Sequence, residues 1–223
     1  MTDQYTESVA AHYAAYRPPL HQRILKRVLD DAGSLSNGLD VGCGTGRSSV
    51  ALAAFCERVF AVDPNQSMLD AATPHEAITY FKGSAENIPL PSQSMDVATF
   101  AGSLSYANFD ATVEELTRVC RPDALIVPYD YSVLIDNVLR SFDIATQVPD
   151  STYDHRAGFS GISAFIEILA THERIQLDIK TTDLAHILLA DSARHEAFVR
   201  RYENAHPIIE LATELNSTTQ STT

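Results

Sequence analysis

Basic residues are scarce in this chain of 223 residues. Lys and Arg together number 16 against 29 Asp and Glu, which leaves a formal net charge of −13. Such an acidic chain repels phosphate-rich partners, and no run of Lys and Arg forms a local exception. We therefore expect the chain to bind neither nucleic acid nor an anionic membrane.

Long apolar runs and cysteines are also few. No stretch reaches the roughly 18 uninterrupted apolar residues of a membrane-spanning helix, and the first residues, with Asp3 and Glu7, do not resemble a signal peptide. Cys43, Cys56 and Cys120 form an odd set without the spacing of a metal site. These absences predict a cytoplasmic protein with free thiols and no bound metal.

The glycines that are present include a dense group. Residues 42, 44 and 46 are glycine and follow an apolar run that ends at Asp40, and residues 47 to 55 favour a helix. A strand, a glycine loop and a helix form the unit that binds nucleotide-like ligands, because the loop lets a ligand approach the backbone without meeting a Cβ. The alternative is a purely structural turn.

The spacing of the glycines narrows the range of ligands that this loop could bind. A dinucleotide-binding loop would need a third glycine at position 47, which is Arg47, and a phosphate-binding loop would need a lysine that is absent here. What remains is G-x-G-x-G with Asp40 two residues before Gly42. A carboxylate at Asp40 suits a ligand with a positive ammonium group better than one with a pyrophosphate.

A second acid, Asp63, ends the short apolar strand at residues 57 to 62. An acid at the end of the second strand can accept both hydroxyls of a ribose. Asp63 could instead cap the next helix, with Pro64 at its first position and Gln66 completing a capping box. The two roles are compatible.

A third segment runs from Lys82 through Gly-Ser-Ala-Glu to Pro91, followed by an apolar strand at 95 to 101. Together, the three segments resemble the class I S-adenosylmethionine-dependent methyltransferases, in which the third forms the adenine-side loop. Ser84 stands where the family often has aspartate, which weakens the expected adenine contact. The resemblance implies S-adenosyl-L-methionine as cofactor and these binding residues: Arg17, Asp40, Gly42, Cys43, Gly44, Gly46, Asp63, Pro64, Met68, Ser84, Ala85, Glu86, Phe100 and Ala101.

The N-terminal segment adds to this resemblance. Tyr5, Tyr13 and Tyr16 recur at helical spacing within residues 4 to 16, before Arg17-Pro18-Pro19. This pattern resembles the leader of small-molecule methyltransferases related to the trans-aconitate group, which implies a helical lid at 1–34. By resemblance, Arg17 would pair with the cofactor carboxylate, and Tyr5 and Tyr13 would line the pocket. The alternative is an amphipathic docking helix.

The fold expected is a Rossmann-like, doubly wound α/β sheet, mostly parallel, with six or seven strands in a methyltransferase domain at 35–216. A cap insertion is expected around 131–172 and a disordered tail at 217–223. Pro128 predicts that the fifth strand, at 124–130, is short and bent there. Further helices are predicted at 110–120, 132–147, 162–172 and within 183–215, and a sixth strand at 175–179.

The implied reaction is methyl transfer to an oxygen or nitrogen, including that of a carboxylate, of a small molecule, and the oligomeric state is left open. The family often places a histidine after the fourth strand, where this chain has Ser105 and Tyr106. His12, His155 and Tyr106 are the catalytic candidates, with His172 as a further histidine; a carboxylate acceptor would need no base. Candidate substrate-binding residues are Tyr5, Tyr13, Ser105, Arg140 and Arg156. The alternative is a cofactor-binding regulatory or partner subunit without chemistry of its own.

Overall fold

The computed structural model describes residues 7–16, 18–144 and 153–220. The chain divides into two units by its internal contacts. A sheet unit comprises residues 19–132 and 150–170, and a helical unit comprises residues 1–18, 133–149 and 171–223. The glycine loop and both acids that end predicted strands belong to the sheet unit.

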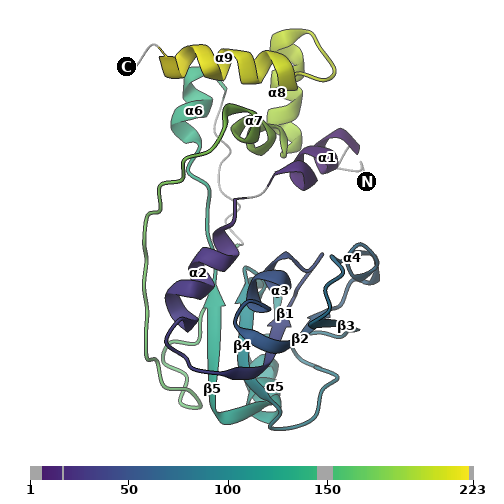
Figure 1. Cartoon of the computed structure of the whole chain (residues 1–223), viewed down its shortest axis with the longest axis vertical. Coiled ribbons are helices and arrows are strands. Elements are labelled where there is room, and N and C mark those ends of the chain that lie inside the picture. The colour runs from purple at the N-terminus through teal and green to yellow at the C-terminus, as the bar shows by residue number, and fades with distance from the viewer. Residues whose placement is uncertain (1–6, 17, 145–152, 221–223) are drawn as a thin grey trace. The chain divides into compact units, whose positions relative to one another are not determined.

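The sheet unit contains five parallel strands in the order β3-β2-β1-β4-β5 (Figure 1). The strands are β1 (Leu35–Val41), β2 (Cys56–Asp63), β3 (Ile78–Lys82), β4 (Met95–Ala101) and β5 (Cys120–Tyr129). The strand order reverses at β1, whose neighbours are β2 and β4. Ligands in open α/β sheets bind at this reversal, outside the carboxyl ends of the strands.

Helices cover both faces of this sheet. Val59 and Ala61 of β2 pack in one core with α2 (Leu20–Leu29) and α3 (Arg47–Leu52), and the alternate residues Phe60 and Val62 pack in a second core with α5 (Phe109–Val119). Burial on both faces explains why these strands have near-continuous apolar sequences. The short elements α4 (Gln66–Asp70) and η1 (Leu104–Tyr106) follow β2 and β4.

The helical unit has a core of its own. It contains α1 (Glu7–Ala15), α6 (Asp136–Ser141), α7 (Thr181–Leu189), α8 (Ser192–Tyr202) and α9 (Ile208–Gln220). Leu139, Leu188, Phe198 and Leu211 are buried together at its centre. Across the described ranges, no helix is both long enough and apolar enough to cross a membrane.

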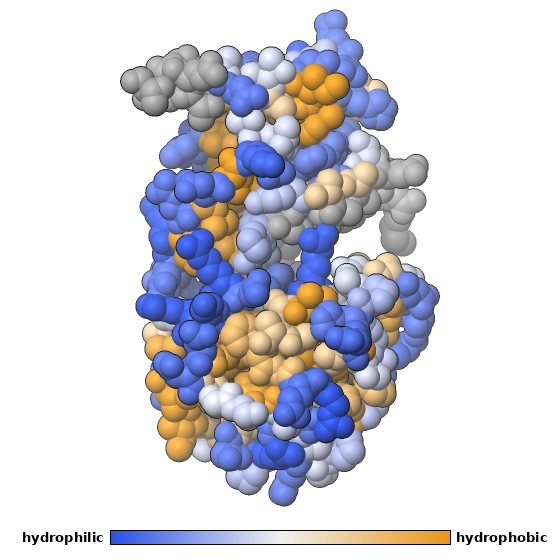
Figure 2. All heavy atoms as spheres, in the orientation of Figure 1, coloured by the Kyte–Doolittle hydropathy of each residue, from blue (hydrophilic) through white to orange (hydrophobic). Residues whose placement is uncertain are grey.

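The expected Rossmann-like fold is confirmed, but its periphery differs from the prediction. The predicted sixth strand at 175–179 does not form, because this segment pairs with no described strand, and no helix forms at 162–172. Within 162–172, the side chains of Ile166, Ile168 and Leu169 are exposed. Figure 2 likewise shows apolar residues at the molecular surface. Alternating sequence alone does not form a strand, because its hydrogen bonds must come from a neighbouring strand.

Three element boundaries were also wrong. β5 runs on past Pro128, which pairs with Phe100, because a strand at the sheet edge tolerates the missing N–H of proline. Within the helix predicted at 132–147, the described helical part is only Asp136–Ser141. The predicted disordered tail is wrong through residue 220, because α9 continues to Gln220; residues 221–223 lie outside the described range.

Candidate functional site

The glycine loop joins the carboxyl end of β1 to α3. The backbone N–H groups of Gly42 and Cys43 donate to the carbonyl of Val62, at 2.8 and 3.1 Å, which ties the loop to the end of β2. All three loop glycines have positive φ angles. A Cβ at Gly42 would come within 2.4 Å of the Ser103 Cβ, whereas a Cβ at Gly44 would meet nothing within 4 Å. Gly44 therefore faces open space.

Asp63 lies against this open part of the loop. Its Oδ2 accepts a hydrogen bond from the Gly44 N–H at 2.8 Å, and its Oδ1 accepts one from the Asn65 N–H at 2.8 Å. The helix cap of α4 is Asn65, whose side chain accepts from the Ser67 N–H. The capping box proposed for Asp63 and Gln66 is therefore wrong, and Asp63 instead joins the glycine loop to the end of β2.

Asp40 has a different environment. Its carboxylate is fully buried and accepts hydrogen bonds from the hydroxyls of Ser48 and Ser49, both at 2.6 Å, and of Thr99 at 3.0 Å. Burial raises the pKa of Asp40, and the three hydroxyls oppose that rise. The carboxylate thus connects β1 to α3 and β4 and has no exposed surface of its own.

The loop after β3 completes this side of the site. The Gly83 N–H donates to the Asp63 carbonyl at 3.2 Å, so the predicted adenine-side loop lies beside β2. A hydrogen bond from the Ser84 hydroxyl lowers the pKa of Glu86, which also accepts from the Asn108 N–H. Ser84, the departure from the family pattern, thus holds Glu86. Of the other predicted cofactor contacts, Pro64 and Met68 are exposed, Ala85 and Ala101 are half-buried, and Cys43 and Phe100 are buried.

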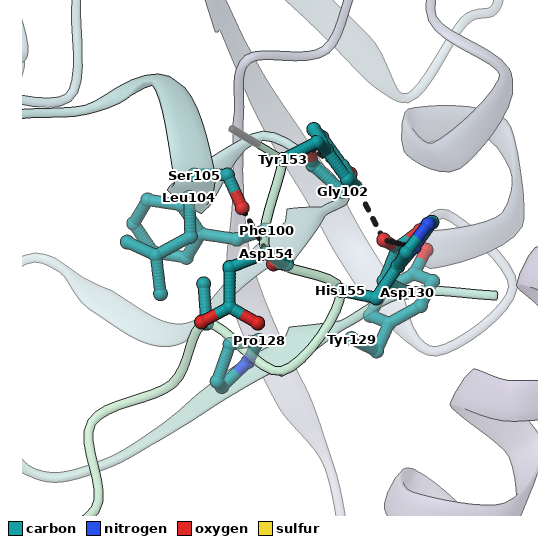
Figure 3. A pocket seen from close by; sticks show the side chains of 11 residues that line it. Phe100, Gly102, Leu104, Ser105, Pro128, Tyr129, Asp130, Tyr153, Asp154 and His155 are labelled. Atoms are coloured by element: carbon teal, nitrogen blue, oxygen red, sulfur yellow. Dashed lines mark hydrogen bonds and ion pairs between the residues drawn. The ribbon is translucent and has the colours of Figure 1, made fainter. Parts of the chain in front are cut away.

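A second group of polar side chains lies at the carboxyl ends of β4 and β5 (Figure 3). Asp130, just after β5, accepts hydrogen bonds from the Tyr153 hydroxyl at 2.9 Å and from Nδ1 of His155 at 2.6 Å. The Ser105 hydroxyl donates to the Asp154 carbonyl at 2.7 Å. These residues surround a cavity of about 10 Å³, which has room for about one water molecule.

The structure distributes the other predicted site residues between the two units. Tyr106 and Arg156 are exposed in the sheet unit, and the Tyr106 ring lies 5.5 Å from that of Tyr153. His12 and Arg140 belong to the helical unit, where His12 contacts His186 and Arg140 contacts Asn137. Three predicted contacts are not described: residues 5 and 17, and the side chain of residue 13.

Sequence reasoning missed the central member of the second group. Asp130 was not predicted, and Tyr153 was noted only as part of a polar loop. The signal for Asp130 was available, because it is an acid that directly follows a parallel strand, as Asp63 ends its own. Another unpredicted contact places Nδ1 of His21, in α2, 3.0 Å from the hydroxyl of the half-buried Tyr129, and desolvation raises the pKa of that hydroxyl.

Cysteine and metal chemistry are not evident in the described part of the chain. All three cysteines are buried as free thiols, and burial raises the pKa of each. No group of three or more His, Cys, Asp or Glu side chains among the described residues could hold a metal ion.

Comparison with known proteins shows what this site resembles. Residues 39–127 match the family model described as a methyltransferase domain. These residues include the glycine loop, Asp63 and the loop after β3. The chain carries a class I S-adenosylmethionine-dependent methyltransferase domain. Its cofactor class is therefore S-adenosyl-L-methionine.

Individual relatives agree with this assignment. The chain is 35% identical over 114 residues to a malonyl-[acyl-carrier protein] O-methyltransferase of Yersinia pestis, covering 50% of this chain and 42% of the relative. It is 31% identical over 97 residues to a ubiquinone/menaquinone biosynthesis C-methyltransferase of Rubrivivax gelatinosus, covering 42% and 39%. The chain thus spans less than half the length of these curated relatives.

A solved structure covers more of the methyltransferase. A protein from Anaeromyxobacter dehalogenans, assigned as a type II methyltransferase, is similar with a TM-score of 0.63 and 28% identity, over 91% of this chain and 89% of that chain. The fold follows from this similarity, and the matched residues are those of a methyltransferase domain. These similarities do not favour the alternative of a binding subunit without chemistry.

The residues of the glycine loop fit the cofactor that this family implies. The open space at Gly44 is a cradle that a Cβ would fill, and the Asp63 carboxylate stands at its side. The loop that could contact an adenine, from Gly83 to Glu86, lies next to Asp63 through the Gly83 hydrogen bond. These three features lie at the carboxyl edge of β1, β2 and β3.

Proposed function

We propose that this chain binds S-adenosylmethionine at the carboxyl edge of β1 and β2 and transfers its methyl group to an oxygen or nitrogen of a small molecule. The observation that carries the proposal is the open space at Gly44 beside the Asp63 carboxylate. The cofactor supplies an electrophilic methyl on a positively charged sulfur, so the protein need only bind, orient and exclude water.

Each element of the loop has a role in this proposal. The backbone at Gly44 would lie against the cofactor, and Asp63, already fixed by two backbone N–H groups, would accept the ribose hydroxyls with its remaining lone pairs. Asp40, which we expected to meet the ammonium group, has no exposed surface. We therefore assign Asp40 the role of holding β1, α3 and β4 in place around the loop.

A small-molecule acceptor agrees with the charge of the chain. The net charge of −13 disfavours nucleic acid as the methyl acceptor. The curated relatives include one named for O-methylation and one named for C-methylation. The matched domain therefore does not fix the acceptor atom, and the acceptor class must come from residues outside the cofactor loop.

A valine scan of two glycines tests the cofactor site. Gly44→Val would fill the cradle, and we expect it to abolish binding of S-adenosylhomocysteine in isothermal titration calorimetry. Gly33→Val is the matched control, because Gly33 also has a positive φ and open surroundings, so both variants carry the same backbone strain. Gly33→Val should lose a similar amount of folding stability, yet it should bind S-adenosylhomocysteine with wild-type affinity. Wild-type affinity in Gly44→Val would place the cofactor elsewhere.

A further inference from the structure

Asp130 holds two side chains from a segment that lies more than twenty residues away. Its Oδ2 accepts hydrogen bonds from Nδ1 of His155 and from the Tyr153 hydroxyl, and its Oδ1 accepts one from the Tyr131 N–H. The Asp130 side chain is 18% exposed and that of His155 is 56% exposed. The carboxylate is thus largely covered, while the imidazole reaches solvent.

This arrangement fixes the proton on the imidazole. An ionised carboxylate only accepts hydrogen bonds, so Nδ1 of His155 must be the donor to Asp130. Neutral His155 then has its free lone pair on Nε2. Within the described residues, no group forms a hydrogen bond with that nitrogen. The histidine and aspartate of serine hydrolases have the same arrangement, in which the oriented imidazole accepts a proton as a general base.

The pair lies next to the glycine loop. A Cβ at Gly102, just after β4, would come within 2.9 Å of the Tyr153 hydroxyl and 3.1 Å of Asp130 Oδ1. The next residue, Ser103, donates to the Val41 carbonyl and lies against Gly42. Two consecutive residues after β4 therefore contact Tyr153 and Asp130, which hold the imidazole, on one side and the glycine loop on the other.

The surroundings of His155 limit what it can act upon. The cavity of about 10 Å³ is too small for a methyl-accepting substrate. The methyl acceptor must therefore lie against the exposed face of the imidazole. Tyr106, which is 81% exposed, and Tyr153 extend an aromatic surface there, with the Tyr153 and His155 rings 4.6 Å apart. Asp130 and Asp154 also line this site, and their negative charges disfavour an anionic methyl acceptor.

Arg156 is the nearby cation along the chain. Its backbone N–H donates to the Asp154 carboxylate, and the residue is exposed. Exposed charges contribute little to binding because water screens them. A carboxylate acceptor held by Arg156 would also leave an oriented base without a proton to remove.

We propose that His155 is the general base of the methyl transfer, that Asp130 and Tyr153 are its positioning residues, and that the acceptor is a neutral or cationic small molecule with a hydroxyl or amine proton. This inference rests on the proposed function and narrows it. The acceptor's oxygen or nitrogen lone pair forms a bond to the methyl carbon, and the carbon–sulfur bond breaks with its electron pair remaining on a neutral thioether. The acceptor proton moves to Nε2 of His155 and then to solvent, while Asp130 keeps the Nδ1 proton.

The first test reads the imidazole proton directly and needs no acceptor. In wild-type protein with ¹⁵N-labelled histidine, the neutral form of His155 should carry its proton on Nδ1 in NMR spectra that report two-bond nitrogen–proton couplings. Asp130→Asn should shift this population toward Nε2, while Tyr153→Phe should leave it mainly on Nδ1. A wild-type His155 protonated on Nε2 when neutral would overturn the proposal.

The second test identifies the acceptor class. The protein is incubated with S-adenosylmethionine carrying a labelled methyl group and a protein-free metabolite extract of the source organism. Labelled ethers and amines survive base treatment, whereas methyl esters of carboxylates release labelled methanol. Base-stable product is expected. Base-labile product alone, or no labelled product from protein that binds S-adenosylhomocysteine, would overturn the inference.

Variants then assign the base for that product. His155→Asn should lower kcat by about 100-fold or more with the calorimetric affinity for S-adenosylhomocysteine unchanged. His75→Asn is the matched control, because His75 is an exposed histidine in the loop before β3 and the substitution keeps a side-chain acceptor for the Ala77 N–H. A wild-type kcat in His155→Asn would overturn the role of His155 as the base. If wild-type protein did not bind S-adenosylhomocysteine, that result would instead contradict the proposed function.

Discussion

Two aspartates at the ends of neighbouring strands differ in burial and in hydrogen-bond partners. Asp40 of β1 is fully buried and held by three hydroxyls, and Asp63 of β2 binds two backbone N–H groups beside the open cradle. The difference follows from what each side chain meets. Asp40 points at α3, which supplies Ser48 and Ser49, whereas Asp63 points at the turn of the glycine loop.

At this scale, Asp40 should make stability depend on pH. Burial raises the pKa of Asp40 in the folded chain above the ordinary value of 3.8. At pH values between 3.8 and the raised pKa, the folded chain keeps a proton on Asp40 that the unfolded chain has lost. Stability should therefore fall as the pH rises from 3.8 through the raised folded value. Asp40→Asn cannot ionise, so its unfolding free energy, measured in urea across this window, should lack that decline. Parallel profiles for the two proteins would contradict the prediction.

Asp63 should matter for the ligand and not for its helix. Asp63→Asn removes the charge that would accept ribose hydroxyls, and a hydrogen bond to a charged group contributes about 1.5–3 kcal/mol. We expect roughly 10- to 150-fold weaker binding of S-adenosylhomocysteine in calorimetry. The α4 cap should persist, because Asn65 provides it. An unchanged dissociation constant would show that Asp63 only orders the loop.

At the scale of elements, α5 anchors the segment that follows the adenine-side loop. Glu115 accepts from the Ile88 N–H, and Arg118 donates to the carbonyls of Ile88 and Leu90. The two side chains also pair with each other, which lowers the pKa of Glu115. One turn of a helix thus satisfies the backbone polar groups of an irregular stretch, which otherwise would be costly to bury.

Removing this anchor should destabilise the sheet unit. Arg118→Ala deletes hydrogen bonds to two backbone carbonyls, and we expect a loss of about 1–3 kcal/mol in the free energy of unfolding. Arg58→Ala, at an exposed position of β2, is the control and should change stability by less than about 0.5 kcal/mol. Equal effects in chemical denaturation would show that the Arg118 contacts add nothing beyond its charge.

At the scale of the whole molecule, one of the two units contains a cluster of histidines. The helical unit places His12 of α1 against His186 of α7 and near His195 of α8. Burial, followed by the charges of His186, His195 and His206, lowers the pKa of His12 from 6.5 to about 4. The His12 and His186 Nδ1 atoms lie 2.9 Å apart, so one must donate and the other accept, and both cannot be charged without loss of the contact.

The helical unit should therefore loosen on acidification. Between pH 6.5 and about 4 the unfolded chain binds a proton at His12 that the folded chain does not, so stability falls as the pH decreases through this window. Hydrogen exchange, corrected for intrinsic rates, should show α1 and α7 losing protection in this range. His12→Gln should reduce the loss, and equal protection at both ends of the window would contradict the prediction.

The sequence by itself predicted the strands and the glycine loop of the candidate cofactor site. Glycines at 42, 44 and 46, the apolar strands and an acid near the end of each of the first two strands form a local pattern, and backbone sterics make that pattern a strand, a loop and a helix. The Rossmann-like fold and the methyltransferase domain were predicted from the resemblance of this pattern to a known family, and both are confirmed. The helical lid at 1–34 stays a prediction.

Only the tertiary structure decided the rest. The pairing of Asp130 with His155 joins residues 25 positions apart, and the burial of Asp40 depends on hydroxyls from α3 and β4. The alternating segment at 175–179 forms no strand because it lacks a described partner strand. Local sequence sets backbone preferences, but a side chain's hydrogen bonds and a strand's pairing are set by whatever distant segment packs beside it.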